Sequence, residues 1–294
     1  EAPWAEQTAA ILELYLGGQG VGEACDRLLY GQANPSGRLA ESFPLRIEDN
    51  PSYLSFGGDG KKVDYTEGVY VGYRYYEAKK QPVRWAFGHG LSYTEFKYDH
   101  LTVSSKELDD ENEIIVEVDV TNVGACAGKE VVQLYVADKN GTVKELKGFT
   151  KLFLQPRETK KAQMKISARD LSFYNEEIKD WYAPSGTYEI LIGHASDDIR
   201  ISCEVSFTTK KQLPFQVTGT TTIGELLADS RTAAATMELL APLQQNGENG
   251  EEISEADQQM IQAILEGLPL KSLSIAGVTG ETIEGIIYKL NELC

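Results

Sequence analysis

The sequence predicts a mixed fold: a partial α/β domain, then an all-β sandwich, then a helical C-terminal tail. Apolar residues recur at helical spacing near the N-terminus and alternate with polar residues through the middle of the chain. They return to helical spacing after Leu213. We therefore expect four parts: 1–63 for the end of the α/β domain, 64–100 for an aromatic, glycine-rich connection, 101–210 for the sandwich and 211–294 for an acidic helical tail.

The N-terminal part is predicted to run from helix to glycine loop, helix and strand. Residues 4–16 place apolar side chains on one helical face, and residues 21–30 repeat that pattern before the helix-ending Gly31. Leu39 to Phe43 predict a short strand. This order is typical of the closing part of an α/β layer. Because the strands are too few to complete a sheet, we expect upstream sequence to complete it.

The stretch 64–96 is dense in tyrosine, tryptophan, phenylalanine and glycine, and it suggests two interpretations. Aromatic rings offer large apolar faces with polar tips, which together with carboxylates can hold sugars, so Tyr65, Glu67 and Arg74 are candidates for the vicinity of a substrate. The favoured interpretation is an architectural joint, in which Glu67 accepts hydrogen bonds from the backbone or from Arg74.

The middle of the chain alternates apolar and polar residues with turn residues between the runs. Regularly spaced strands of this kind predict an antiparallel sandwich. The expected strands include residues 114–121, 132–136, 152–154, 162–166, 188–192 and 199–208.

The tail returns to helical spacing, with Thr222 as a candidate N-cap and a polar linker at 246–252. We expect a helical appendage, and partner binding is the alternative. The expected helices cover residues 223–227, 237–240, 254–265 and 282–293.

Composition narrows the classes of function. A net charge of -17 argues against nucleic acid or an anionic membrane surface as a partner. No apolar run approaches the roughly 18–20 residues of a membrane-spanning helix. The first residues are acidic, unlike the basic start of a signal peptide.

The residues that could carry metal or cofactor chemistry are few. The four cysteines are scattered without C-x-x-C spacing, so free thiols are expected rather than zinc; Cys126 and Cys203 are the one pair that could bridge, and we expect them not to. This favours a reducing compartment and thus the cytoplasm. The histidines lack metal-ligand spacing, and no nucleotide-binding fingerprint occurs, so we expect no metal and no cofactor. Arg38, Arg74 and Arg84 are expected to form structural ion pairs.

Three sets of motifs carry a resemblance to a known family. Residues 3–44 (PWAEQTAAILELYLGG…GRLAESFP) resemble the second half of the α/β sandwich domain of glycoside hydrolase family 3. Residues 65–96 (YTEGVYVGYRYYEAKKQPVRWAFGHGLSYTEF) are similar to that family's C-terminal signature. VTNVGACAGKEVVQLYVAD, ELKGFTKLFLQPRET and ARDLSFYN resemble its fibronectin type III-like, immunoglobulin-like sandwich.

The resemblance implies a retaining β-glucosidase as the parent enzyme, which uses a nucleophilic carboxylate and an acid/base carboxylate. In the family these groups lie on a TIM-like barrel and on the earlier part of the α/β domain, and neither matching segment occurs here. Asp180-Trp181 is not taken as the nucleophile motif, because it lies within the sandwich pattern.

We therefore expect a non-catalytic C-terminal portion of a β-glucosidase, with no catalytic residue in this chain. Its expected partners are the TIM-like barrel, the first part of the α/β domain and a β-glucoside or oligosaccharide substrate. The alternative is a carbohydrate- or protein-binding β-sandwich module without hydrolase activity.

Overall fold

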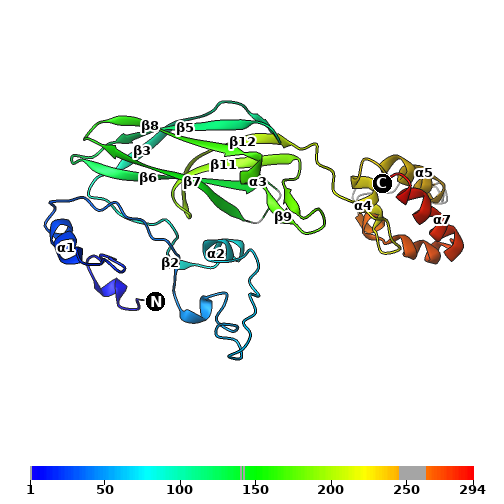
Figure 1. Cartoon of the computed structure of the whole chain (residues 1–294), viewed down its shortest axis with the longest axis horizontal. Coiled ribbons are helices and arrows are strands. Elements are labelled where there is room, and N and C mark those ends of the chain that lie inside the picture. The colour runs from blue at the N-terminus through cyan, green and yellow to red at the C-terminus, as the bar shows by residue number, and fades with distance from the viewer. Residues whose placement is uncertain (1, 140, 142, 245–262) are drawn as a thin grey trace, which may run out of the picture. The chain divides into compact units, whose positions relative to one another are not determined.

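The structure, a computed structural model, describes residues 2–139, 141, 143–244 and 263–294. The chain forms two compact units. Unit 1 comprises Glu1–Asn175 with Lys179–Lys211, and unit 2 comprises Glu176–Ile178 with Gln212–Cys294. Figure 1 labels the elements of both units.

Unit 1 begins with short helices and two short strands and continues into a β-sandwich. Its first elements are η1 (Ala5–Gln7), α1 (Val21–Leu29), β1 (Phe43–Pro44), η2 (Ile47–Asp49), α2 (Tyr73–Ala78) and β2 (Val83–Trp85). Its later elements are β3 (Phe96–Val103), β4 (Glu107–Asp109), β5 (Glu113–Asn122), β6 (Gly128–Asp138), β7 (Lys144–Leu154), β8 (Thr159–Ser167), α3 (Ala168–Leu171), β9 (Phe173–Asn175), β10 (Asp180–Tyr182), β11 (Gly186–Ala195) and β12 (Asp198–Thr208).

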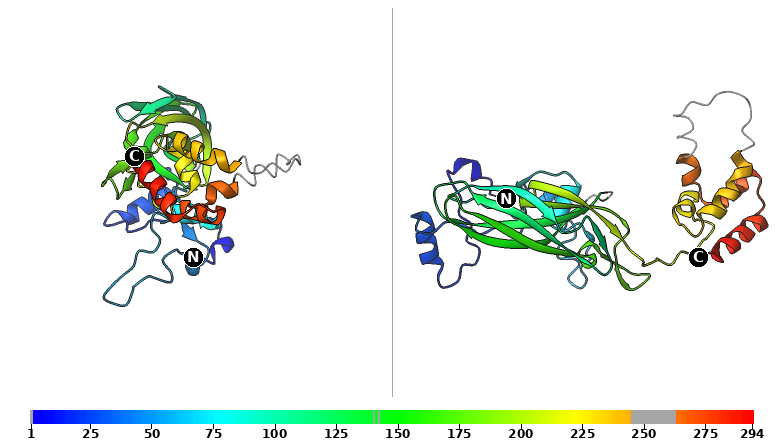
Figure 2. Two further views of the ribbon diagram at one scale, coloured as in Figure 1. Left: turned by 90° about the vertical axis from the view of Figure 1, so that its right-hand side faces the viewer. Right: turned by 90° about the horizontal axis from the view of Figure 1, so that it is seen from above.

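Two sheets make the sandwich, as the alternating pattern predicts. One has the strand order β4-β12-β11-β6-β7 and the other β3-β5-β8. Viewed along the strands, the sheets curve around a common interior (Figure 2). The pairings are antiparallel, as predicted, except that of the short edge strand β4 with β12, which is parallel.

The core of unit 1 lies between these sheets. Val116, Val118 and Val120 of β5 face Val132 and Leu134 of β6, and none of the five exposes any surface. Burying such side chains contributes about 1.5–3 kcal/mol each, which makes the sandwich the stable body of the unit.

The segment before the sandwich has no comparable core. Among the described residues up to Gly72, Ser42 is the only one buried as a whole residue, and the Arg38 side chain is buried as well. Leu54 and Phe56 lie almost entirely in solvent. The helices α1 and α2 and the two-stranded β1–β2 sheet agree with a partial α/β domain.

Two predictions for this segment need correction. Residues 8–20 are not helical: only η1 forms within the predicted helix 4–16. Ile11 and Leu12 are exposed, and a short helix is marginal in water unless its apolar face packs against something. The strand predicted from Leu39 begins only at Phe43, where the chain pairs with Trp85 of β2.

Unit 2 is helical, as predicted. Its elements are α4 (Ile223–Ala228), α5 (Ala233–Gln244), η4 (Leu270–Ala276) and α7 (Gly280–Asn291), with residues 263–267 also helical. Thr222 caps α4 by accepting a hydrogen bond from the backbone N–H of Glu225, which confirms the predicted N-cap. The predicted linker 246–252 and the start of the predicted helix 254–265 lie outside the described residues.

A small apolar core holds unit 2 together. Leu226 and Leu270 are fully buried, and Ile283 and Leu290 bring α7 onto them. No helix among the described residues has the length and apolarity to span a membrane.

Candidate functional site

The three residues predicted near a substrate have different surroundings. Tyr65 is 87% exposed and Glu67 is half-buried in a turn closed by the Tyr70 N–H to Glu67 carbonyl hydrogen bond. Arg74, on α2, donates to Glu145 Oε1 of β7 at 3.0 Å. The structure therefore joins Arg74 to the sandwich rather than to Glu67.

Helix α2 is fixed on the outer surface of the sandwich by its first residue. The hydroxyl of Tyr73 accepts a hydrogen bond from the backbone N–H of Leu146 at 2.8 Å. Its ring stacks on Phe87 with centroids 4.8 Å apart and meets Tyr135 edge-on at 6.0 Å. Burial raises the pKa of Tyr73, so its hydroxyl stays protonated at neutral pH.

The carboxylate of Glu145, which accepts a hydrogen bond from Arg74, also pairs with Lys147. Burial alone would raise the pKa of Glu145, but hydrogen bonds and charge from Lys147 and Arg74 lower it. Lys147 Nζ lies 2.7 Å from Glu145 Oε2. Glu145 is therefore ionised at neutral pH and links α2 to β7 as a structural ion pair.

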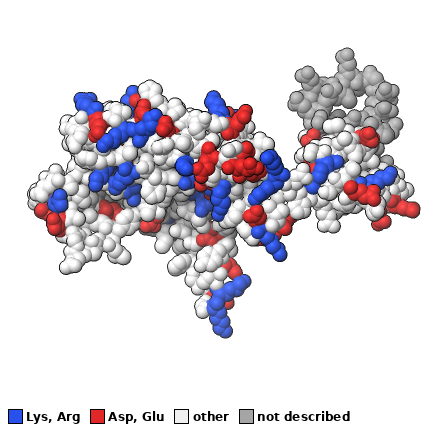
Figure 3. Space-filling view, turned by 45° about the horizontal axis from the view of Figure 1, so that its top comes forward, with Lys and Arg blue, Asp and Glu red and all other residues white. Residues whose placement is uncertain are grey.

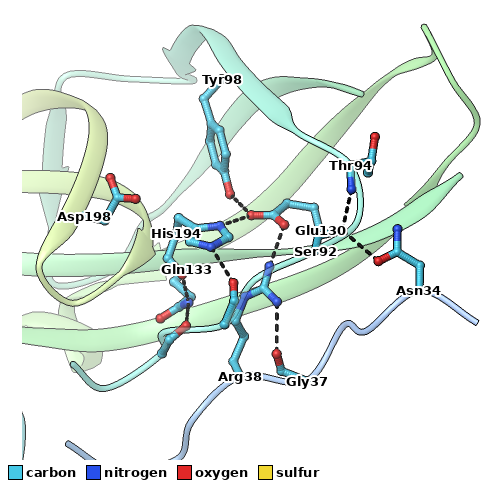
Figure 4. A network of polar contacts seen from close by, with 12 residues as sticks. Asn34, Gly37, Arg38, Ser92, Thr94, Tyr98, Glu130, Gln133, His194 and Asp198 are labelled. Atoms are coloured by element: carbon cyan, nitrogen blue, oxygen red, sulfur yellow. Dashed lines mark hydrogen bonds and ion pairs between the residues drawn. The ribbon is translucent and has the colours of Figure 1, made fainter. Parts of the chain in front are cut away.

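A second attachment is a buried polar network around Glu130 of β6 (Figure 4). The Glu130 side chain is fully buried. Its Oε2 accepts from Arg38 Nη2 at 2.6 Å, and its Oε1 accepts from the hydroxyl of Tyr98 at 2.6 Å. Burial, and then the charge and hydrogen bond of Glu130, strongly raise the pKa of Tyr98, which keeps this hydroxyl a donor.

His194 completes the network from β11. Its Nδ1 lies 2.5 Å from Glu130 Oε1, and its Nε2 lies 2.9 Å from the carbonyl oxygen of Gly90. A carbonyl oxygen and an ionised carboxylate only accept hydrogen bonds, so this geometry fits an imidazole that carries a proton on both nitrogens. Arg38 and His194 thus both contact one buried carboxylate, and the three side chains tie the N-terminal segment and the glycine-rich loop to the sandwich.

The glycine-rich loop is held by Gln133 of β6. Its amide nitrogen donates to the carbonyl oxygen of Gly88 at 3.2 Å and also to that of His194, while its Oε1 accepts from the hydroxyl of Tyr135 at 2.6 Å. Gly88 has a φ of +81°, and a Cβ there would lie 2.2 Å from Gln133 Oε1. Glycine is therefore required at this position for both backbone and space.

Asn34 makes a further link between the N-terminal segment and the sandwich. Its Oδ1 accepts from the Ser92 hydroxyl and from the backbone N–H of Tyr93, both at 2.9 Å. Its amide nitrogen donates to the carbonyl oxygen of Ala127 at 3.0 Å. Hydrogen bonds of this kind fix chain direction, so residues 34–38 follow a defined path along the sandwich.

A shallow, open pocket of about 300 Å³ lies beside α2. Glu77 and Asp197 are among its lining residues. Burial raises the pKa of Glu77, although Lys144 Nζ approaches Glu77 Oε2 to 2.6 Å. With its carboxylate already paired, Glu77 serves here to anchor α2 to β7.

The remaining residues of chemical interest also have structural partners. Asp180 Oδ2 lies 2.8 Å from Lys211 Nζ, and that hydrogen bond lowers the pKa of Asp180.

All four cysteines are free thiols. Within the part of the chain that the structure describes, no cluster of His, Cys, Asp and Glu could hold a metal ion.

The sequence anticipated only part of this arrangement. The prediction of structural ion pairs is confirmed for Arg38, Arg74 and Arg84, the last with Glu6 at 3.9 Å. The roles of Glu130 and His194 were missed. Glu130 offered a signal, because it stands in register with the core-facing residues of β6 and a lone carboxylate there needs partners.

Two family models match the chain. The model of the glycosyl hydrolase family 3 C-terminal domain matches residues 1–73, and that of a fibronectin type III-like domain matches residues 130–196. The first covers the segment without a core, and the second covers strands β6 to β11.

Curated relatives match over all or most of the chain. The chain is 40% identical to thermostable beta-glucosidase B of Acetivibrio thermocellus, across 100% of this chain and 39% of the relative. It is 37% identical to an exo-alpha-(1->6)-L-arabinopyranosidase of Bifidobacterium breve, across 96% of this chain and 37% of the relative. The chain thus spans well under half the length of these two relatives.

Solved structures agree with these matches. The chain superposes on a GH3 beta-glucosidase of Bifidobacterium adolescentis with a TM-score of 0.72 and 35% identity, covering 81% of this chain and 35% of that one. For beta-glucosidase 3B of Thermotoga neapolitana, in complex with alpha-D-glucose, the TM-score is 0.64 and the identity 36%, covering 69% and 29%.

Proposed function

The chain belongs to glycoside hydrolase family 3 and is the C-terminal region of such an enzyme, and from this premise we propose that it is a non-catalytic scaffold within a retaining glycosidase. In this role the segment 1–63 completes an α/β domain, the sandwich supports it from one side, and the catalytic carboxylates lie outside this chain.

One observation carries the proposal: a segment without a core is attached by hydrogen bonds and an ion pair to a sandwich that has one. Up to Gly72 the described chain buries no large apolar side chain, while apolar residues such as Leu54 and Phe56 face solvent. Monomeric proteins rarely leave so many large apolar side chains exposed, and such surfaces mark contacts with other protein. The Glu130 network holds this segment in one path, ready for the rest of its domain.

The proposed reaction of the whole enzyme is hydrolysis of terminal β-D-glucosyl residues. The names of most of the relatives support it, but the relatives that match nearly the whole chain include both a beta-glucosidase and an arabinopyranosidase. Because relatives with different named sugars share this region at similar identity, we place the sugar preference in the part outside the chain.

The test is a chimera in which this chain replaces the matched region of the Acetivibrio thermocellus enzyme. The isolated chain should not hydrolyse an aryl β-glucoside, and the chimera should. Clear turnover by the pure isolated chain, or a folded but inactive chimera, would refute the scaffold role.

Within the chimera, Tyr65, Glu67 and Arg74 separate a joint from a substrate contact. We propose that they belong to a joint, because Arg74 is already committed to Glu145. Glu67→Ala should then lower the melting midpoint and leave KM unchanged. A raised KM with an unchanged melting midpoint would instead assign Glu67 to the vicinity of the substrate.

A second candidate function is a carbohydrate-binding module without hydrolase activity. It is favoured by exposed rings before α2, Tyr65 at 87% and Phe56 at 85% exposure. Aromatic faces of this kind can stack on sugars. Calorimetric titration of the isolated chain with gluco-oligosaccharides should show binding if this is right, and absence of binding would remove it.

A further inference from the structure

The outer surface of strands β6 and β7 carries an unusual set of side chains. In the antiparallel register Lys129 stands opposite Phe153, Val131 opposite Lys151 and Gln133 opposite Phe149. Successive residues of a strand point to opposite faces, so these alternate positions share the face turned away from the core. We call Lys129, Val131, Phe149, Lys151 and Phe153 the basic–aromatic face.

This face is open to solvent. Phe149 is 68% exposed and Phe153 47% exposed, and both lysines are exposed as well. The ammonium group of Lys160 lies 6.0 Å from the ring centre of Phe153 and pairs with Glu158 at 3.2 Å. Two phenylalanine rings beside two ammonium groups form a surface that water alone solvates poorly.

Among the described residues, the lysines of the face lack acidic partners, unlike most lysines of the sandwich. Lys161 and Lys165 of β8 each pair with a glutamate of β5 at 2.8 Å, and basic and acidic atoms lie next to each other over the surface drawn in Figure 3. Across the described residues, neither Lys129 nor Lys151 forms an ion pair. Burial, then the charges of Lys129 and Arg38, lower the pKa of Lys151, as expected for cations gathered without a counter-charge.

The outer surface of β6 is already covered at its other end, where Gln133 and Tyr135 contact an earlier part of the chain. Gln133 lies beneath the carbonyl of Gly88, and Tyr135 lies beneath the ring of Tyr73. Residues of the aromatic, glycine-rich connection, Tyr73 and Gly88, thus cover this sheet up to Gln133, and the basic–aromatic face continues from that edge.

We propose that the basic–aromatic face binds the part of the family 3 enzyme that lies outside this chain, through a segment that places carboxylates beside apolar side chains. This inference rests on the proposed function. Three observations identify this partner. The face continues the end of the sheet that the chain already covers, and the relatives contain a large part that this chain lacks. Carboxylates on the partner would also complement the positive charge of the two lysines.

Lysine footprinting on the chimera described above tests the contact directly. Lys129 and Lys151 should react with an acetylating reagent at least fivefold more slowly in the chimera than in the isolated chain. Lys106, exposed between β3 and β4, is the control and should react equally in both. Equal rates at Lys151 in an active chimera would overturn the inference and leave the proposed function intact.

A variant pair tests whether the contact contributes to stability. Phe149→Ser with Lys151→Glu should lower the melting midpoint of the chimera and leave that of the isolated chain unchanged, because the face is bare there. The matched control, Phe173→Ser with Lys106→Glu, should behave alike in both proteins. If the first pair impairs folding of the isolated chain, Lys151→Gln alone provides the same comparison.

The remaining outcomes are also decisive. An inactive chimera would remove both the proposed function and this inference. Lysines that are already protected in the isolated chain, and that become reactive after removal of 212–294, would place the acidic C-terminal unit on the face and overturn the inference.

Discussion

Replacing Glu130 by glutamine should strongly destabilise unit 1. The carboxylate is fully buried and accepts from Arg38 and Tyr98 at 2.6 Å each and from His194 at 2.5 Å. Glutamine keeps the shape but supplies one acceptor oxygen, and its NH₂ group would face a donor. Removing one partner of a buried ion pair costs about 3–5 kcal/mol, because the other charge stays buried without compensation.

We expect the lower end of that range for Glu130→Gln. The His194 side chain keeps 18% of its surface exposed, so water relieves part of the imbalance. A loss of about 3 kcal/mol lowers the melting midpoint by roughly 6–12 °C in a unit of this size, at about 2–4 °C per kcal/mol.

Urea unfolding followed by far-UV circular dichroism measures the effect. The matched control is Glu113→Gln, which removes an exposed carboxylate paired with Lys165 at 2.8 Å. Exposed pairs contribute about 0–1 kcal/mol, so the control should remain close to the unchanged chain. A Glu130→Gln loss no larger than that of the control would show that the network does not hold unit 1 together.

Backbone geometry, core packing and a short-range ion pair each give a further expected outcome. Gly88→Ala should cost about 1–3 kcal/mol in urea unfolding, because of its positive φ and the clash with Gln133; an unchanged midpoint would contradict this. Leu226→Ala should destabilise the helical unit by about 2–5 kcal/mol, seen as faster amide exchange in α4 while the exchange of the sandwich stays unchanged; equal loss of protection in both would refute it. The hydrogen bond from Arg231 lowers the pKa of Asp229 below 3.8, so its stabilising effect is present above that pH and is lost as the pH falls through the folded-state pKa. The stability difference between the unchanged chain and Asp229→Asn should therefore shrink on acidification, and a difference that stays constant as the pH falls would contradict the assignment.

The sandwich was predictable because its signal is local. Alternation in runs such as 114–121 and 199–208 reports directly which face of a strand is buried, and the structure confirms both as β5 and β12. The helix predicted at 4–16 had an equally clear pattern and is wrong. Its apolar stripe is not buried in a core among the described residues, and periodicity alone does not stabilise a short helix.

The candidate sites were predictable only in part, because the signal in a sequence is local. Arg38 could be named as an ion-pair donor, but its acceptor lies 92 positions later and the third member of the network is 64 positions further on. Arg74 was considered with its near neighbour Glu67, whereas its partner is Glu145 on another element. Pairing across such separations depends on strand register, which no local pattern contains.

The sequence alone therefore determined the family, the strand-rich middle, the helical tail and the residue types of the aromatic, glycine-rich connection. Its motifs and periodicities are properties of neighbouring residues. Only the tertiary structure decided what that connection does: Gly88, Gly90 and Tyr73 close onto β6 and β11 through Gln133, His194 and Tyr135. A buried carboxylate must find its cations wherever the fold brings them, so the joint became visible only once the strands were in register.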